Sequence, residues 1–237
     1  MALRIFDTDP EAAAKSRSKA TFDDGTIGRV HSGKQEANAK GQMIPVAIDH
    51  WELSTGDADT ANALGELFRC EVVDTGSASE NFLRIEDTRT DTLEVVLSGP
   101  GALTSDMKLW FGGQLTHHCD GEFFLSGDKI ADLCGCPSLF DERKEQAKVG
   151  RAPKPDIKLI FKLAAAQDLG TFAFRTGSWT MAEDLWKYED ALAQINGPTV
   201  ADLRLELIEY TTKKGKDVSY FKPVLEHIRP YDDANAE

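Results

Sequence analysis

Hydrophobic and polar residues alternate along much of this chain with a period of two, which is typical of half-buried β-strands. The clearest case covers residues 156–163, where Ile157, Leu159, Phe161 and Leu163 alternate with outward positions. Turn residues such as Gly112-Gly113 separate the apolar runs of the first half, so we expect an antiparallel sheet there. Further strands are predicted at 27–30, 44–48, 51–53, 70–73, 82–85, 93–97, 107–111, 172–175, 203–207 and 218–220.

Three segments have the helical period instead. Residues 57–68 place Leu64, Leu67 and Phe68 on one face, with Asp57 or Asp59 as the N-cap. Residues 141–148 are charged and predict a second helix.

The strongest helical pattern covers residues 181–196, and Gly197-Pro198 ends it. Thr180 and Glu183 have the spacing of a capping box at its start. Its apolar stripe consists of Met181, Leu185, Leu192 and Ile195.

These patterns predict an α+β protein with a mostly antiparallel sheet, a few helices and a small metal-binding insertion rich in Cys and His. We expect a partly flexible N-terminal segment at 1–42, an α+β domain at 43–231 and a loose tail at 232–237. The insertion covers residues 114–139 and is called the Cys/His segment. Lys213-Lys214-Gly215-Lys216 predicts a hairpin turn near the C-terminus.

Composition says more about which functions are possible than about which fold the chain adopts. The 237 residues are 41% hydrophobic and 28% charged, with a net charge of −13. Such a charge repels phosphate backbones, so broad nucleic-acid binding is not expected, and a protein partner is easier to justify. No apolar run approaches the roughly 20 residues of a membrane helix, and the N-terminus lacks a secretion signal. We therefore expect a cytoplasmic protein.

The densest chemistry lies in the Cys/His segment. Three of the four cysteines fall there, and clustered cysteines in a reducing compartment more often bind metal or act in redox chemistry than form disulfides. In His117-x-Cys119 and in Cys134-x-Cys136, the two side chains of each pair would point to the same side of a strand. Two such pairs supply the four ligands of a structural zinc site.

Several alternatives stay open for this cluster. His118 replaces His117 as the ligand if the local backbone is a tight turn. The thiols of Cys134 and Cys136 could instead be free or form a redox pair. An enzyme, such as a metal-dependent hydrolase, would need an open metal position and a nearby carboxylate, for which Asp120 and Glu122 are available.

Outside the cluster, a structural role is the preferred interpretation of each candidate residue. Cys70 is interpreted as a buried free thiol and only remotely as a ligand, whereas His31, His50 and His227 are interpreted as surface or core histidines. Trp179 is predicted to anchor the core. The basic residues between 143 and 158 are interpreted first as solvated surface residues and only second as a contact for a partner. Phosphate-loop, hydrolase-elbow and His-Glu-x-x-His motifs do not occur in the sequence.

Taken in order, several short strings resemble the actinophage recombination directionality factor-like family, from about residue 4 to residue 231. They are Ile5-Phe6-Asp7-Thr8-Asp9-Pro10, Ile27-Gly28-Arg29 with Ser32-Gly33, Met107-Lys108-Leu109-Trp110, His117-His118-Cys119-Asp120-Gly121, Cys134-Gly135-Cys136-Pro137, Leu169-Gly170, Phe174 with Thr176-Gly177-Ser178-Trp179, and Tyr210-Thr211-Thr212-Lys213-Lys214-Gly215 with Asp217-Val218-Ser219-Tyr220.

The resemblance implies a regulator and not an enzyme. Such factors bind a phage-encoded large serine integrase, switch it from integration to excision at attL and attR, and inhibit integration. It further implies little direct DNA binding, no small-molecule substrate, no membrane association and a place in the bacterial host's cytoplasm. It supplies no catalytic residues. A single-strand DNA-binding accessory protein, using Trp and basic loops, is a further alternative.

Overall fold

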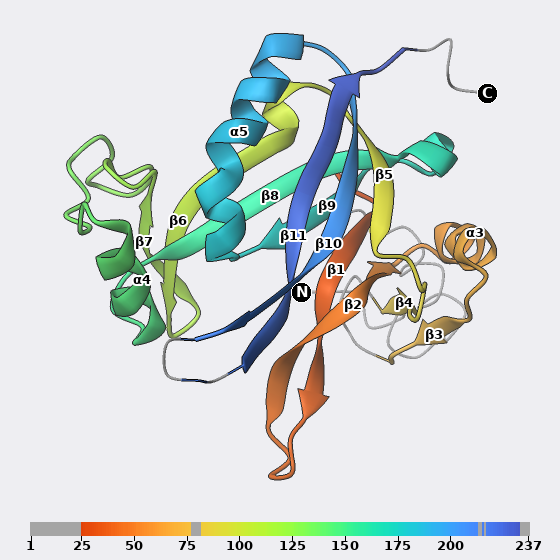
Figure 1. Ribbon diagram of the computed structural model, residues 1–237, viewed down its shortest axis with the longest axis horizontal. Coiled ribbons are helices and arrows are strands. Elements are labelled where there is room, and N and C mark those ends of the chain that lie inside the picture. The colour runs from red at the N-terminus through yellow and green to blue at the C-terminus, as the bar shows by residue number, and fades with distance from the viewer. Residues whose placement is uncertain (1–24, 77–81, 213–214, 216, 233–237) are drawn as a thin grey trace, which may run out of the picture.

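A computed structural model describes residues 25–76, 82–212, 215 and 217–232 (Figure 1). Strands predominate, as the alternating pattern predicts. The strands are β1 (Gly28–Ala37), β2 (Met43–Thr55), β3 (Val72–Asp74), β4 (Leu83–Ile85), β5 (Thr92–Leu97), β6 (Leu103–Phe111), β7 (Gln114–Cys119), β8 (Lys154–Leu163), β9 (Phe172–Thr176), β10 (Thr199–Thr211) and β11 (Asp217–Pro230). The helices are α3 (Ala58–Phe68), α4 (Phe140–Lys148), α5 (Trp179–Ile195) and the short 3-10 turns η1 (Pro100–Ala102) and η2 (Ala164–Leu169).

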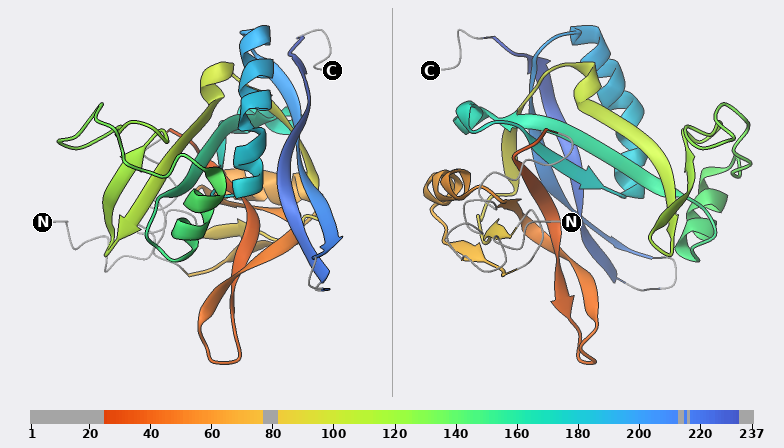
Figure 2. Two further views of the ribbon diagram at one scale, coloured as in Figure 1. Left: turned by 60° about the vertical axis from the view of Figure 1, so that its left-hand side comes forward. Right: turned by 180° about the vertical axis from the view of Figure 1, so that it is seen from behind.

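The strands form one mixed sheet in the order β11-β10-β5-β8-β9-β1-β2-β4-β3, and β6 pairs with both β7 and β8. Neighbours are antiparallel except β1 and β9, which run parallel. The α+β class with a mostly antiparallel sheet is therefore confirmed. Figure 2 shows the β1–β2 hairpin reaching away from the body, while α5 lies against β11.

The core follows from the alternation in the strands. Ile157, Leu159, Phe161 and Leu163 of β8 are all buried, as their period of two predicts. Trp51 of β2 belongs to the same hydrophobic core, and its Nε1 donates to the carbonyl oxygens of Asp91 (2.8 Å) and Leu203 (3.1 Å). These two bonds join β2 to the start of β5 and to β10, so the sheet curls around a shared apolar centre.

Close packing explains a glycine at the start of β1, which lies between β2 and β9. A Cβ on Gly28 would stand 2.7 Å from the Ser54 carbonyl oxygen and 2.8 Å from the Phe172 ring. Real Cβ atoms do not approach so closely, so β1 enters the sheet only with glycine here.

The predicted helices are confirmed, with one correction at a cap. Asp57 caps α3 by accepting from the Thr60 N–H at 2.8 Å. The predicted capping box of Thr180 and Glu183 is wrong, because α5 starts earlier and Ser178 accepts from the Met181 N–H at 3.2 Å. The sequence offers hydroxyl side chains at both positions, and the helix uses Ser178.

Two other differences concern boundaries. The separate strands predicted at 44–48 and 51–53 are one continuous strand, β2. The predicted turn at Lys213-Lys214-Gly215-Lys216 lies mostly outside the described residues, although β10 and β11 do pair antiparallel on either side of it. The division into 1–42, 43–231 and 232–237 stays a prediction, since residues 1–24 and 233–237 are outside the described part. No helix among the described residues is long and apolar enough to cross a membrane.

Candidate metal centre

Strand β7 brings the first two candidate ligands to one side. Leu109 and Met107 of β6 pair with His117 and Cys119, so the latter two lie in the evenly paired part of the hairpin, on one side of the register shift between Leu109 and Trp110. Cys119 is fully buried and His117 is half-buried. The predicted strand geometry of His117-x-Cys119 is therefore what the chain adopts.

The second pair reaches the same place through a turn. Cys134 and Cys136 lie in an irregular segment, and Gly135 between them has a φ of +70°. The prediction of a strand at this pair is wrong, because a left-handed glycine reverses the chain there. The turn is stabilised by the Cys136 N–H, which donates to Cys134 Sγ at 3.5 Å.

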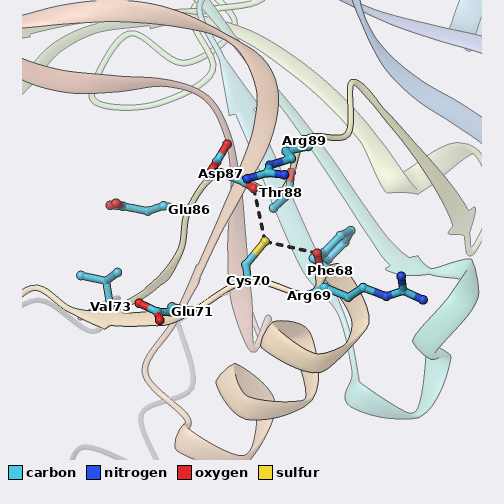
Figure 3. Close-up of a pocket in the computed structure, with 9 residues that line it drawn as sticks. All are labelled: Phe68, Arg69, Cys70, Glu71, Val73, Glu86, Asp87, Thr88 and Arg89. Atoms are coloured by element: carbon cyan, nitrogen blue, oxygen red, sulfur yellow. Dashed lines mark hydrogen bonds and ion pairs between the residues drawn. The ribbon is translucent and has the colours of Figure 1, made fainter.

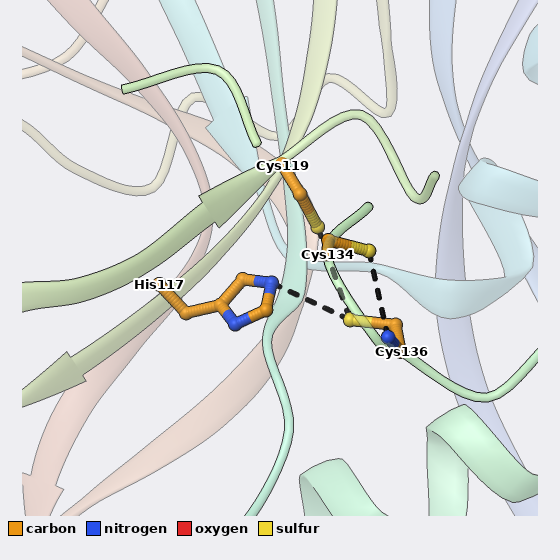
Figure 4. A group of neighbouring side chains, drawn as sticks. All are labelled: His117, Cys119, Cys134 and Cys136. Atoms are coloured by element: carbon orange, nitrogen blue, oxygen red, sulfur yellow. Dashed lines mark hydrogen bonds between the residues drawn. The ribbon is translucent and has the colours of Figure 1, made fainter. Parts of the chain in front are cut away.

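All four side chains converge (Figure 4). Their donor atoms lie within 4.8 Å of one another. Cys136 Sγ is 3.9 Å from Cys119 Sγ and 3.4 Å from His117 Nε2. A disulfide needs about 2.05 Å between sulfur atoms, so the first distance excludes that bond.

The S–S distance of 3.9 Å and the S–N distance of 3.4 Å match two edges of a metal-centred tetrahedron. With zinc–sulfur bonds of about 2.3 Å and zinc–nitrogen bonds of about 2.0–2.1 Å, the S–S edge is about 3.8 Å and the S–N edge about 3.5 Å. Three sulfurs and one nitrogen are a common ligand set of structural zinc sites. The group can therefore hold a metal ion, and its donor set fits zinc.

Without a metal ion, the surroundings of the group favour the uncharged forms of its side chains. Burial raises the pKa of the Cys119 thiol, and burial together with the neighbouring Cys134 raises that of Cys136 to about 12. Burial, and then the neighbouring His118, lowers the pKa of His117, which keeps its imidazole neutral. Bare thiolates would be costly in this position, and a divalent cation is the usual compensation for three sulfurs held so close.

His118 is committed elsewhere, which decides between the two candidate histidines. Its Nε2 lies 3.1 Å from Asp106 Oδ2, and its Nδ1 lies 3.1 Å from Ser126 Oγ. Adjacent residues in a strand point to opposite faces, so His118 points away while His117 points to the cysteines. The Phe124 ring packs against the His117 imidazole, with ring centroids 4.7 Å apart.

A polar framework holds the chain between the two pairs. Asp120 Oδ1 accepts from the backbone N–H groups of Glu122 (2.8 Å) and Phe123 (2.7 Å), and these bonds lower the pKa of its carboxyl group. The Cys134 N–H donates to the Glu122 carbonyl oxygen at 2.8 Å. The carboxylate of Asp120 thus shapes the turn after Cys119.

Arg143, on the first turn of α4, ties this framework to the rest of the protein. Its guanidinium donates to the carbonyl oxygens of Gly121, at 2.6 Å, and of Pro137. Gly121 has a φ of +106°, and a Cβ there would stand 2.9 Å from Arg143 Nη1. Sequence reasoning missed Arg143 and treated it as part of a solvated basic stretch. The one sequence signal for this contact is that Arg143 lies only six residues after Pro137.

Cys70 takes no part in the group. It is half-buried, and Figure 3 shows its thiol directed at the carbonyl oxygens of Phe68 and Asp87, both 3.3 Å away. It is a free thiol, as predicted, but it is not fully buried, and a role as remote ligand is excluded by its separation from the group. Burial raises the pKa of this thiol.

The remaining candidates have partners of their own. His31 Nε2 lies 2.7 Å from Ser54 Oγ, and the imidazoles of His50 and His227 lie 2.7 Å from Asp49 and Asp202. Trp179 is half-buried rather than a central core residue. Its ring meets Phe140 edge-on, with centroids 5.4 Å apart, and so joins α5 to α4.

Comparison with known families gives one match. A family described as Gp3-like, recombination directionality factor-like, matches residues 27–228 of this chain. The matched range contains all four donor residues and Arg143. No solved structure matches the chain.

Proposed function

We propose that this chain, which belongs to the recombination directionality factor-like family, binds a phage large serine integrase and switches it from integration to excision. The match over residues 27–228 carries the proposal, because it spans nearly all of the described chain. On this proposal the factor promotes recombination between attL and attR, inhibits integration, and acts in the cytoplasm of the bacterial host. The partner is a protein, and direct nucleic-acid binding is slight.

The proposed mechanism is a shift between two states of the integrase complex. A factor that binds the excision-competent arrangement more tightly than the integration-competent one, by about 3–5 kcal/mol, would reverse the preferred direction. This requires binding energy only, with no chemistry on the factor. A net charge of −13 agrees with a protein partner rather than DNA.

The donor group supports a structural metal rather than an active site. Four protein donors fill a tetrahedron and leave no position for a catalytic water. Asp120, a candidate base, already accepts two backbone hydrogen bonds. We therefore propose that the chain is not an enzyme and that His117, Cys119, Cys134 and Cys136 hold one zinc ion. When bound, the zinc supplies a rigid link between β7 and the Cys134-Gly135-Cys136 turn.

The function is tested with the purified protein, its cognate integrase and DNA carrying attL and attR. We expect excision products only when both proteins are present, reduced integration from attP and attB, and a complex of the two proteins by gel filtration without DNA. Absence of both excision and complex formation would refute the proposal. Salt-dependent binding to single-stranded oligonucleotides, with no effect on the integrase, would favour the DNA-binding alternative.

The metal is tested separately by elemental analysis of the native protein. We expect about one zinc per chain. A metal-free protein with unchanged stability would contradict the structural zinc without bearing on the integrase.

A further inference from the structure

A groove of about 700 Å³ lies beside the tip of the β6–β7 hairpin. Trp110 and Phe111 form one wall, and Val149 and Gly150, which follow α4, form another. Trp110 is 61% exposed and Phe111 78%, although both are large apolar side chains. An exposed cluster of this kind on one edge of an acidic protein marks an interaction site more often than chance exposure.

The sheet itself creates the groove. Strand β6 pairs with β8 only as far as Lys108, which is opposite Lys154, so residues 109–111 extend past the start of β8. Among the strands that the structure describes, β7 is their only neighbour. The segment after α4 passes on the open side, and Figure 1 shows α4 and the hairpin at the same edge of the sheet.

The metal centre connects the two walls. His117 of the donor group pairs with Leu109 in the hairpin, while Arg143 of α4 donates to the carbonyl oxygens of Gly121, two residues after Cys119, and of Pro137, next to Cys136. The distance between hairpin and α4 is thus fixed through the Cys/His segment. A groove with walls held in this way is pre-organised for binding.

The charge of the groove is opposite to that of the whole chain. Lys108, Lys154 and Arg175 line it, with Asp156 as the only acidic residue among the lining residues. Asp156 is shared by Lys108 (2.6 Å) and Arg175 (2.8 Å). Lys154 is exposed and has no ion-pair partner in the part of the chain that the structure describes. The groove therefore has a positive excess in a chain of net charge −13.

We infer that this groove docks a segment of the integrase that carries an apolar side chain flanked by carboxylates. The inference rests on the proposed function and assigns the surface by which it is carried out. The apolar side chain packs between Trp110, Phe111 and Val149, and a carboxylate meets Lys154 at the rim. Interfaces of this form concentrate their binding energy in a buried aromatic contact surrounded by polar residues.

The same observations disfavour the other occupants. A nucleic-acid strand needs a track of free cations, whereas two of the three cations here are already engaged by Asp156. A second copy of this chain would bring another charge of −13 against the first. A partner segment with one or two carboxylates satisfies the single free lysine.

The test measures the affinity of full-length variants for the cognate integrase without DNA. Trp110→Ala should weaken binding by about 10-fold or more, as truncation of a central aromatic contact does. Lys154→Glu should weaken it several-fold, with the largest loss at low salt and in the association rate. Trp186→Ala and Lys162→Glu are matched controls: Trp186 is 64% exposed on α5, and Lys162 is exposed on the same strand as Lys154. Both controls should bind as the wild type does.

The outcomes separate this inference from the proposed function. If wild-type protein binds the integrase and both groove variants bind equally well, the groove assignment is wrong while the function stands. If the wild type does not bind, the function fails and the inference fails with it. The assignment is likewise overturned if Trp110→Ala leaves integrase binding intact but abolishes oligonucleotide binding or converts a dimer to a monomer. Thermal unfolding of each variant, expected unchanged because the side chains are exposed, checks folding.

Discussion

The sheet body and the Cys/His segment (114–139) are held together by different interactions. In the body, Leu97, Leu159, Phe161 and Leu203 are fully buried and belong to one hydrophobic core that spans several strands. In the Cys/His segment, Cys119 and Cys134 are the buried residues, whereas apolar side chains such as Leu133, 71% exposed, face solvent. The donor atoms of the cluster therefore take the place that a hydrophobic core has in the body.

This contrast teaches how a short irregular segment keeps one conformation. A segment of 26 residues cannot bury enough apolar surface to offset the entropy of ordering it, so small units rely on metals or disulfides. In the Cys/His segment, the residues that hold the chain in place are the four donors, Asp120 and Arg143. The two regions should therefore respond to different perturbations, and substitutions in one should leave the other intact.

The largest effect is expected in the body. Phe161→Ala removes a fully buried ring and should lower the free energy of global unfolding by about 3–5 kcal/mol, measured by urea denaturation. Leu133→Ala, in the Cys/His segment, should change it by less than about 0.5 kcal/mol. As long as each variant remains folded, its zinc content should equal that of the wild type. A large global effect of Leu133→Ala would mean that the segment has an apolar core after all.

The next effect is on the metal. Cys134→Ser should weaken zinc binding more than about 100-fold, since even residues that only support a ligand contribute 10–100-fold. Amide hydrogen exchange should accelerate within the Cys/His segment and stay slow in β8 and β10. Cys70→Ser is the matched control, because Cys70 lies outside the donor group, and it should retain one zinc. Equal zinc retention by both variants would contradict the proposed ligand set.

Sequence reasoning found what local periodicity and residue chemistry can encode. The alternation in 156–163 fixes which side of β8 is buried, and His117-x-Cys119 fixes which side of β7 carries ligands. It could not find contacts between distant segments. Nothing near Trp51 indicates that its indole reaches Leu203, and nothing near Arg143 indicates that it binds Gly121.

The errors have the same origin. Cys134-Gly135-Cys136 has the spacing of a strand pair, yet the glycine adopts a left-handed conformation because the chain must return to β7. Ser178 and Thr180 are both capable caps by residue type, and α5 begins at Trp179 with Ser178 as its N-cap. Tertiary constraints select among conformations that the local sequence permits equally.

A third prediction concerns the acid sensitivity of the body. Burial, with the nearby charges of Arg84 and Arg29, lowers the pKa of His31 to about 4. Folding favours the neutral imidazole. The full free energy of unfolding is therefore present above pH 6.5, and part of it is lost as the pH falls from 6.5 toward 4. Between pH 7.5 and 5 the loss is about 2 kcal/mol. His31→Gln, which can still bond Ser54, should show a correspondingly shallower decline by urea denaturation at the two pH values. Parallel declines in the two proteins would assign the sensitivity to other groups.

The smallest effect tests whether the Cys/His segment depends on its link to α4. Arg143→Lys keeps the charge but cannot reach both carbonyl oxygens, because an ammonium lacks the planar fork of a guanidinium. Losing one such bond should lower the local opening free energy of the segment by about 1.5 kcal/mol, without a change in global unfolding. Hydrogen exchange at the Phe124 and Cys134 amides, which bond within the segment, measures it. Arg151→Lys, an exposed neighbour, should have no effect. If neither amide responds, the donor group alone holds the segment, and the groove beside Trp110 owes its shape to the hairpin rather than to α4.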